Sequence, residues 1–248
     1  MASAPAEAGG GSSKIVPPSQ RDDGFRVVSE AVSYKRYLTL YDRTVEFPDG
    51  QKAQYKFDVV GHPRAEFHFV AVFPFHPGPQ PAVTMIREYA QGPNHFVWSF
   101  PAGGVDPSRH ASLEATATAE LSEECQLLPG TLVRLLPADH PGILETKWCR
   151  CAARADVKRL RLCSGLLRLT LFARAARSNR FTPFLVIDPV ADPSPGERDP
   201  EESSMTVHQV PLSRLEELLY GDDVLLPTLA TAQLALRELR KRGLLPPA

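Results

Sequence analysis

The sequence predicts an α/β protein with a mixed central sheet. Two apolar runs, 67–75 and 82–89, flank a segment rich in Gly and Pro, which is typical of buried strands joined by a turn. A run rich in Ala, Leu and Glu at 111–125 contains no Gly or Pro, so its helix propensity is high. Two amphipathic helices are expected near the end of the chain, at 212–220 and 226–242.

Composition limits the class of protein. The 248 residues suffice for one sizeable domain or two small ones, and 43% hydrophobic and 23% charged residues are ordinary for a soluble globular chain. A net charge of −1 gives no overall field that would attract nucleic acid or a membrane surface. No apolar run approaches the roughly 20 residues of a membrane span. The four cysteines show neither a disulfide framework nor zinc-ligand spacing, so we expect reduced thiols and a cytoplasmic location.

The N-terminal part divides into a tail and a β arm. Residues 1–20 are Ala, Gly, Ser and Pro with few large apolar groups, so they cannot bury enough surface to fold and should be disordered. Residues 25–62 should form an antiparallel β arm. Within this arm, 37–41 and 54–59 alternate apolar and polar residues around a turn at 47–50.

The predicted helix at 111–125 carries the clearest chemical signal. Glu120, Glu123 and Glu124 are spaced at i, i+3 and i+4, which places their carboxylates on one helical face. The like charges repel one another, and a hard divalent cation would turn that repulsion into binding because Mg²⁺ and Mn²⁺ prefer oxygen ligands. The simpler alternative is a solvated helix face, since helix surfaces favour Glu.

The turn and helix together resemble the Nudix box, whose usual form is GX5EX7REUXEEXGU, where U is aliphatic. Residues 119–124 align with the REUXEE part and keep its three glutamates, and Leu127 takes the last aliphatic place. The resemblance implies a Nudix α/β/α sandwich over residues 63–248 that binds Mg²⁺ or Mn²⁺. The metal ligands implied are the Ala102 carbonyl, Glu120, Glu123 and Glu124, and Glu123 is also a candidate catalytic group. Gly103 and Gly104 would let the backbone approach a substrate closely.

Four positions depart from the motif. Ala119 stands where the family has an Arg that helps to orient the glutamates, which puts the catalytic rate in question. The first motif Glu falls on Ala111, with Glu114 one turn later as a possible substitute. Gln126 replaces the late Gly, which should be a helix stop. The Gly pair also comes one residue early.

The flanking segments resemble the ADP-ribose and ADP-sugar diphosphatases of this superfamily. In those enzymes an N-terminal sheet of this kind helps to form a dimer, so a homodimer through the β arm is implied. Arg87 lies where the subgroup carries an RQYR-like segment near the nucleotide pocket, and Trp98 could stack on an adenine. A core or interface position is the alternative for Trp98.

Residues 149–179 differ sharply from their neighbours. The stretch 149–180 holds nine Lys or Arg against a single acid, Asp156. A strand is possible at 166–173, but 181–187 is a better strand that continues into the rest of the domain. We therefore predict that 149–179 is a basic insertion outside the Nudix core.

The stretch 188–204 is rich in Pro and acid, so it should be a loop before a strand at 205–210. In ADP-ribose diphosphatases an acidic loop at this place supplies the base that activates water. Glu201 and Glu202 occupy that place here, with Glu197 in reserve. A solvated acidic loop is the alternative.

The resemblance implies Mg²⁺-dependent hydrolysis of a nucleoside diphosphate linked to a moiety X. An ADP-ribose or ADP-sugar substrate would give AMP and a sugar phosphate. Arg87, Trp98, Gly103 and Gly104 are the candidate substrate-binding residues. A catalytically weak Nudix-fold module that binds a nucleotide or a protein is the main alternative, and a nucleic-acid binder using the basic insertion is a remote third.

Overall fold

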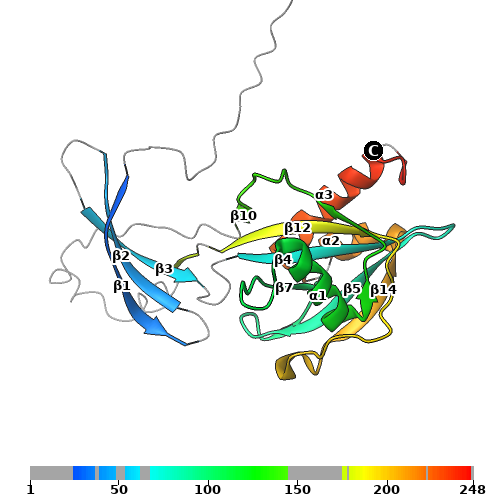
Figure 1. The fold of residues 1–248 in the computed structure, drawn as a ribbon, viewed down its shortest axis with the longest axis horizontal. Helices are drawn as coiled ribbons and strands as arrows, with labels where there is room; N and C mark the ends of the chain where they lie inside the picture. Colours follow the sequence, from blue (N-terminus) through cyan, green and yellow to red (C-terminus); the bar gives the residue numbers. More distant parts are fainter. Residues whose placement is uncertain are drawn as a thin grey trace, which may run out of the picture.

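The computed structural model describes residues 25–36, 39–48, 54–61, 68–144, 175–177, 179–221 and 223–246. Within them the chain forms a small N-terminal sheet and a larger body whose central sheet has helices on both faces (Figure 1). The α/β class, the mixed central sheet and the antiparallel N-terminal strands predicted from the sequence are confirmed. The predicted tail, residues 1–20, lies outside the described residues.

Eight strands of the described chain form the central sheet. These strands are β4 (His68–His76), β5 (Ala82–Ala90), β6 (His95–Ser99), β7 (Ala102–Gly104), β9 (Thr131–Arg134), β10 (Ile143–Leu144), β12 (Arg180–Ile187) and β14 (Thr206–Pro211). β12 runs parallel to β4 along its whole length, and the other pairs are antiparallel. The strand predicted at 181–187 is thus confirmed. A separate two-stranded sheet joins β8 (Leu127–Leu128) to β13 (Val190–Ala191).

Helices cover the central sheet in two layers. Helix α1 (Leu113–Cys125) packs on one face, and α2 (Leu212–Gly221) and α3 (Leu226–Lys241) pack on the other. Successive residues of a strand point to opposite faces, so Val70 and Val72 of β4 contact the α1 layer, whereas Phe73 and Phe75 contact the α2 and α3 layer. Burial on both faces explains the continuous apolar run of this strand. In the described ranges no helix is both long and apolar enough to cross a membrane.

Helix α1 has clear boundaries. It begins at Leu113 because the Ser112 hydroxyl accepts a hydrogen bond from the Ala115 N–H at 3.1 Å, which caps the first turn. It ends at Gln126, whose φ of 58° is left-handed and whose N–H bonds back to the Leu121 and Ser122 carbonyls. Gln126, which stands where the motif has its late Gly, therefore ends the helix, as the sequence predicts.

The N-terminal sheet is an antiparallel meander with one added strand. β1 (Arg26–Lys35), β2 (Thr39–Glu46) and β3 (Gln54–Gly61) pair in order, and β11 (Ala175–Arg177) pairs with β3 in parallel. Residues 175–177 fall inside the predicted insertion, and the structure places them at the edge of this sheet. The rest of that segment, residues 149–174 and 178, including the possible strand at 166–173, lies outside the described residues.

Candidate metal and active site

The site is built where strand β7 meets helix α1. Glu124 lies in the last turn of the helix, and its side chain is almost fully buried. The Ala102 N–H of β7 donates to Glu124 Oε2 at 2.9 Å, which fixes the carboxylate against the turn. The sequence-predicted turn and the sequence-predicted glutamate are therefore in direct contact.

Gly103 is packed against the second glutamate. A Cβ placed on Gly103 would lie 2.0 Å from Cδ of Glu120, so a side chain at this position would collide with the carboxylate. Gly104 pairs with Phe69 in the ladder between β7 and β4. The Gly103 backbone therefore lies close to Glu120. The expected approach of this glycine pair to a substrate stays a prediction.

The clustered carboxylates strongly perturb one another. Burial, followed by the charges of Glu123 and Glu202, raises the pKa of Glu120 to about 8. Burial and the charge of Glu120 raise the pKa of Glu124 well above its usual range. Arg109 pairs with Glu123 at 3.5 Å, but in the described part of the chain neither Glu120 nor Glu124 has an ion-pair partner. No ion pair with a described residue therefore neutralises Glu120 or Glu124, whereas a proton or a bound cation would.

The donor set suits a hard cation, although the side chains do not form a ready-made cage. No group of three or more His, Cys, Asp or Glu side chains among the described residues is arranged to hold a metal ion. The available ligands near the turn are all oxygens, and two are carboxylates held in a buried setting by Gly103 and the Ala102 N–H. Oxygen donors of this kind fit Mg²⁺ or Mn²⁺, with Glu120 and Glu124 as the side chains that would hold it.

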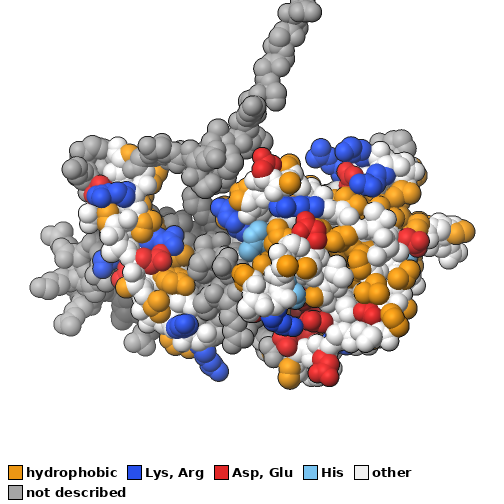
Figure 2. All heavy atoms as spheres, in the orientation of Figure 1, with side chains coloured by type: hydrophobic (Ala, Val, Ile, Leu, Met, Phe, Trp, Pro, Cys, Tyr) orange, Lys and Arg blue, Asp and Glu red, His pale blue; other side chains and the backbone are white. Residues whose placement is uncertain are grey.

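The loop before β14 lies along the same helix. The Ser122 hydroxyl donates to Asp192 at 2.6 Å and accepts from the Gly196 N–H at 3.0 Å. A Cβ on Gly196 would lie 2.5 Å from Cγ of Glu123, so the loop backbone packs directly on this glutamate. Several acidic side chains lie together at the lower edge of the larger body, where Figure 1 shows the segment before β14 (Figure 2).

Glu202 is the loop carboxylate that the structure brings to the cluster. Its side chain is half-buried and accepts a hydrogen bond from the Asp199 N–H at 3.2 Å. Burial raises its pKa, and its charge in turn raises the pKa values of Glu120 and Glu124. Glu197 is exposed on the loop, and the side chain of Glu201 lies outside the described part of the structure.

Arg198 fastens this loop to the helix, and sequence reasoning missed it. Its guanidinium donates to the backbone carbonyls of Glu124 at 2.7 Å, Glu123 at 3.3 Å and Met205 at 3.4 Å. It therefore caps the last turn of α1, where helix carbonyls have no partner within the helix. The only available signal was a single Arg in an acid-rich loop.

Comparison with known proteins identifies the fold. No family model and no curated protein matches the sequence. The crystal structure of an ADP compounds hydrolase aligns over 89% of this chain and 97% of its own length, with a TM-score of 0.56 and 16% identity. The chain has a Nudix-like fold. The NUDIX domain of Shewanella oneidensis NrtR, solved with ADP ribose, aligns over 69% of this chain and 87% of its own, with a TM-score of 0.43 and 15% identity.

Strand β5 lies beside the glutamates, and its side chains alternate between the two faces of the central sheet. Ile86 packs in the α1 layer, and Glu88 lies close enough for its charge to raise the pKa of Glu124 and Glu202. The Ser99 hydroxyl donates to Glu88 and holds it in place. Glu88 is thus a further acidic group of the cluster, which strand alternation could have suggested once one face of β5 was assigned.

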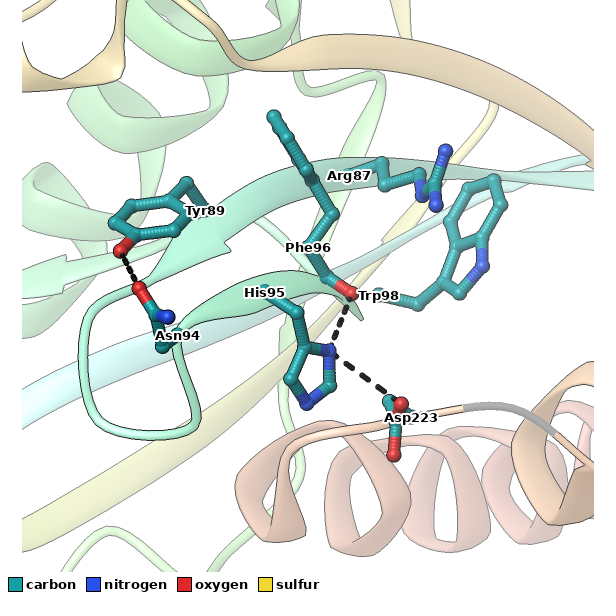
Figure 3. Close-up of a pocket in the computed structure, with 7 residues that line it drawn as sticks. All are labelled: Arg87, Tyr89, Asn94, His95, Phe96, Trp98 and Asp223. Carbon is teal, nitrogen blue, oxygen red and sulfur yellow. Dashed lines mark hydrogen bonds and ion pairs between the residues drawn. The ribbon is translucent and has the colours of Figure 1, made fainter.

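Arg87 and Trp98 lie on the other face of the Nudix-like sheet. Met85, two residues before Arg87, belongs to the core beneath α2 and α3, and Trp98 packs against that same core. The structure therefore does not bring these two predicted substrate-binding residues together with the glutamates. Both line a separate pocket together with Tyr89 and Phe96 (Figure 3).

Proposed function

We propose that this protein hydrolyses the pyrophosphate bond of a nucleoside diphosphate linked to a moiety X, with a divalent metal ion. The observation that carries the proposal is the pair of half-buried Glu120 and buried Glu124, which have no ion-pair partner in the described residues and lie beside Gly103 in a Nudix-like fold. ADP-ribose or an ADP-sugar is the proposed substrate, giving AMP and a sugar phosphate. The description of the aligned neighbour as an ADP compounds hydrolase supports this class.

Each residue of the site has a separate role in the proposed hydrolysis. A bound Mg²⁺ or Mn²⁺ would neutralise pyrophosphate charge and polarise phosphorus. Glu120 and Glu124 would hold the ion, with the Ala102 carbonyl and Glu123 as further ligands. Water adds to phosphorus, the bridging P–O bond breaks, and the water proton passes to a carboxylate. Glu202 is the proposed acceptor because its raised pKa makes it a stronger base, and Glu201 is the reserve.

Glu124→Gln tests the site with little change in shape. The amide keeps an oxygen to accept from the Ala102 N–H, but the charge is lost. With a panel of nucleotide sugars and Mg²⁺, we expect at least a ~100-fold fall in kcat, as when metal-mediated charge stabilisation is removed. Chelator should abolish wild-type activity. Mg²⁺ should raise the Tm of the wild type and leave the Tm of this variant unchanged.

Glu216→Gln is the matched control, because Glu216 is an exposed residue of helix α2 and has no role in the proposed site. Its activity should equal that of the wild type. Full activity in Glu124→Gln would show that the reaction occurs elsewhere. Saturable nucleotide binding without hydrolysis of any panel member would favour the second candidate, a weak or inactive nucleotide-binding module, which the Ala119 substitution in the box motivates.

We also propose a homodimer through the N-terminal sheet. Strand β1 is exposed along nearly its whole length, and Val27, Val32 and Tyr34 are each more than half exposed. A second copy of the chain would cover these apolar groups. Light scattering should give the mass of a dimer, and Val32→Lys should shift it toward the monomer. A wild-type monomer at high concentration would contradict the proposal.

A further inference from the structure

A pocket of about 440 Å³ lies on the face of the central sheet opposite the glutamates (Figure 3). Arg87 and Tyr89 of β5 and Phe96 and Trp98 of β6 form its floor, and Asp223, between α2 and α3, closes one side. Binding sites for small molecules have volumes of about 300–1,000 Å³. The pocket is therefore large enough for a ligand of nucleotide size.

The pocket is separate from the proposed catalytic site. Along β5, Glu88 points to the glutamate face and the flanking Arg87 and Tyr89 point to the opposite face. The sheet itself stands between the two groups of residues. A ligand in this pocket would therefore have no contact with Glu120 or Glu124.

Arg87 supplies an unneutralised positive charge. No described residue makes an ion pair with it, and its guanidinium carbon lies 5.6 Å from the centre of the Phe96 ring. Arg87 is also the cross-strand neighbour of Trp98, and Figure 3 shows the guanidinium beside the indole. Rings lie on either side of the planar group, and its N–H donors make no hydrogen bond to a described side chain, which suits bidentate binding of a phosphate.

The aromatic side chains offer an exposed and ordered surface. Tyr89 is 40% exposed and Phe96 is 41% exposed, and their ring centres are 6.1 Å apart in an edge-to-face arrangement. The Tyr89 hydroxyl donates to the Asn94 side chain, which fixes the ring. An accessible ring of this kind can stack on a planar ligand at little cost in conformational entropy.

The remaining wall offers a hydrogen-bond acceptor. His95 Nδ1 lies 3.4 Å from the Asp223 carboxylate, which is itself 73% exposed. The backbone N–H of Trp98 donates to the backbone carbonyl of Asp223 at 2.8 Å, and this hydrogen bond connects Asp223 to β6. The exposed carboxylate can accept from hydroxyl or amino groups of a ligand.

We propose that this pocket is a binding site for a phosphate monoester of a planar aromatic compound, of the size of a nucleoside monophosphate. Arg87 binds the phosphate, Phe96 and Tyr89 contact the ring, and Asp223 accepts from its polar groups. This inference does not rest on the proposed function, because it uses none of the glutamates.

Titration of the full chain with AMP in EDTA tests the site, because chelation removes any metal from the glutamates. We expect saturable binding by calorimetry and a change in Trp98 fluorescence in a Trp148→Phe background. Adenosine and inorganic phosphate should each bind at least about tenfold more weakly than AMP, because each lacks half of the recognised groups. Glu124→Gln should bind AMP as the wild type does.

Two variants remove one half of the site each. Arg87→Met keeps the aliphatic stem but loses the charge, and Phe96→Leu keeps an apolar group but loses the ring. Both should weaken AMP binding at least about tenfold. Arg240→Met, an exposed charge on α3, is the matched control and should bind normally. Unchanged affinity in both pocket variants, loss of binding in Glu124→Gln, or no saturable binding to the wild type would overturn the proposal.

Discussion

Arg198→Ala tests whether the loop that carries Glu202 must be fastened to helix α1. Arg198 makes three contacts with backbone carbonyls, one short and two near 3.4 Å. A hydrogen bond from a charged donor contributes about 1.5–3 kcal/mol, and the two long contacts add little. We therefore expect the substitution to lower the free energy of unfolding by about 2 kcal/mol.

The stability loss has a measurable size in the thermal transition. For a chain of this length, about 2 kcal/mol corresponds to a fall in Tm of about 4–8 °C. Arg198→Lys should lie between the wild type and the alanine variant, since it keeps the charge and loses the planar fork. Arg214→Ala is the control, because Arg214 is 71% exposed and its one ion pair among the described residues is with Glu217 on the same helix, so the Tm of this variant should equal that of the wild type.

The same variant should affect catalysis more than substrate binding. Releasing the loop displaces the proposed proton acceptor, and general base catalysis contributes about 10²–10⁴-fold, so a partial loss should lower kcat at least about tenfold. KM should change less, since the glutamates stay on the helix. Steady-state hydrolysis of ADP-ribose with Mg²⁺, measured well below the Tm, separates the two. Wild-type values of both kcat and Tm in Arg198→Ala would refute the reasoning.

Three further predictions concern helix α1. Ala119→Arg should leave kcat within about twofold if Arg198 already holds the glutamate helix, and a clear rise would show that the missing arginine limits turnover. In chelator, the stability of the wild type should fall as pH rises from about 4.5 toward 8. Over this range the folded state keeps the Glu120 proton that the unfolded state has lost, so Glu120→Gln should flatten the Tm profile. Gln126→Gly should raise the free energy of unfolding by about 0.5–1 kcal/mol in a denaturant titration, because Gly adopts the left-handed conformation without strain.

The local sequence pattern was sufficient to predict the elements that bury apolar residues. An apolar run predicted β12, and a helix-forming run with Glu at i, i+3 and i+4 predicted α1. The contact between the Gly103 turn and Glu120 was also accessible, because the motif places turn and helix side by side. These predictions depend on residues close together in the chain.

The remaining contacts of the site depend on the path of the chain. Arg198 meets the Glu124 carbonyl across 74 residues, and no local pattern encodes that meeting. Alternation in β5 shows that Arg87 and Glu88 point to opposite faces, but not which face α1 covers. The sequence therefore assigned Arg87 and Trp98 to the same site as the glutamates, whereas in the structure their side chains lie on the opposite face of the sheet. The pairing of β11 with β3 is equally non-local.

The pairing of β11 also limits how the N-terminal sheet can move. The chain passes between the two sheets three times, from β3 to β4, from β10 to β11 and from β11 to β12. A single connection would permit free twisting of one sheet against the other, whereas several connections oppose it. The shortest of these connections, Arg177 to Arg180, can span at most about 10 Å. The parallel strands on either side of it act as anchored ends, so any swing of the arm pivots close to the start of β12.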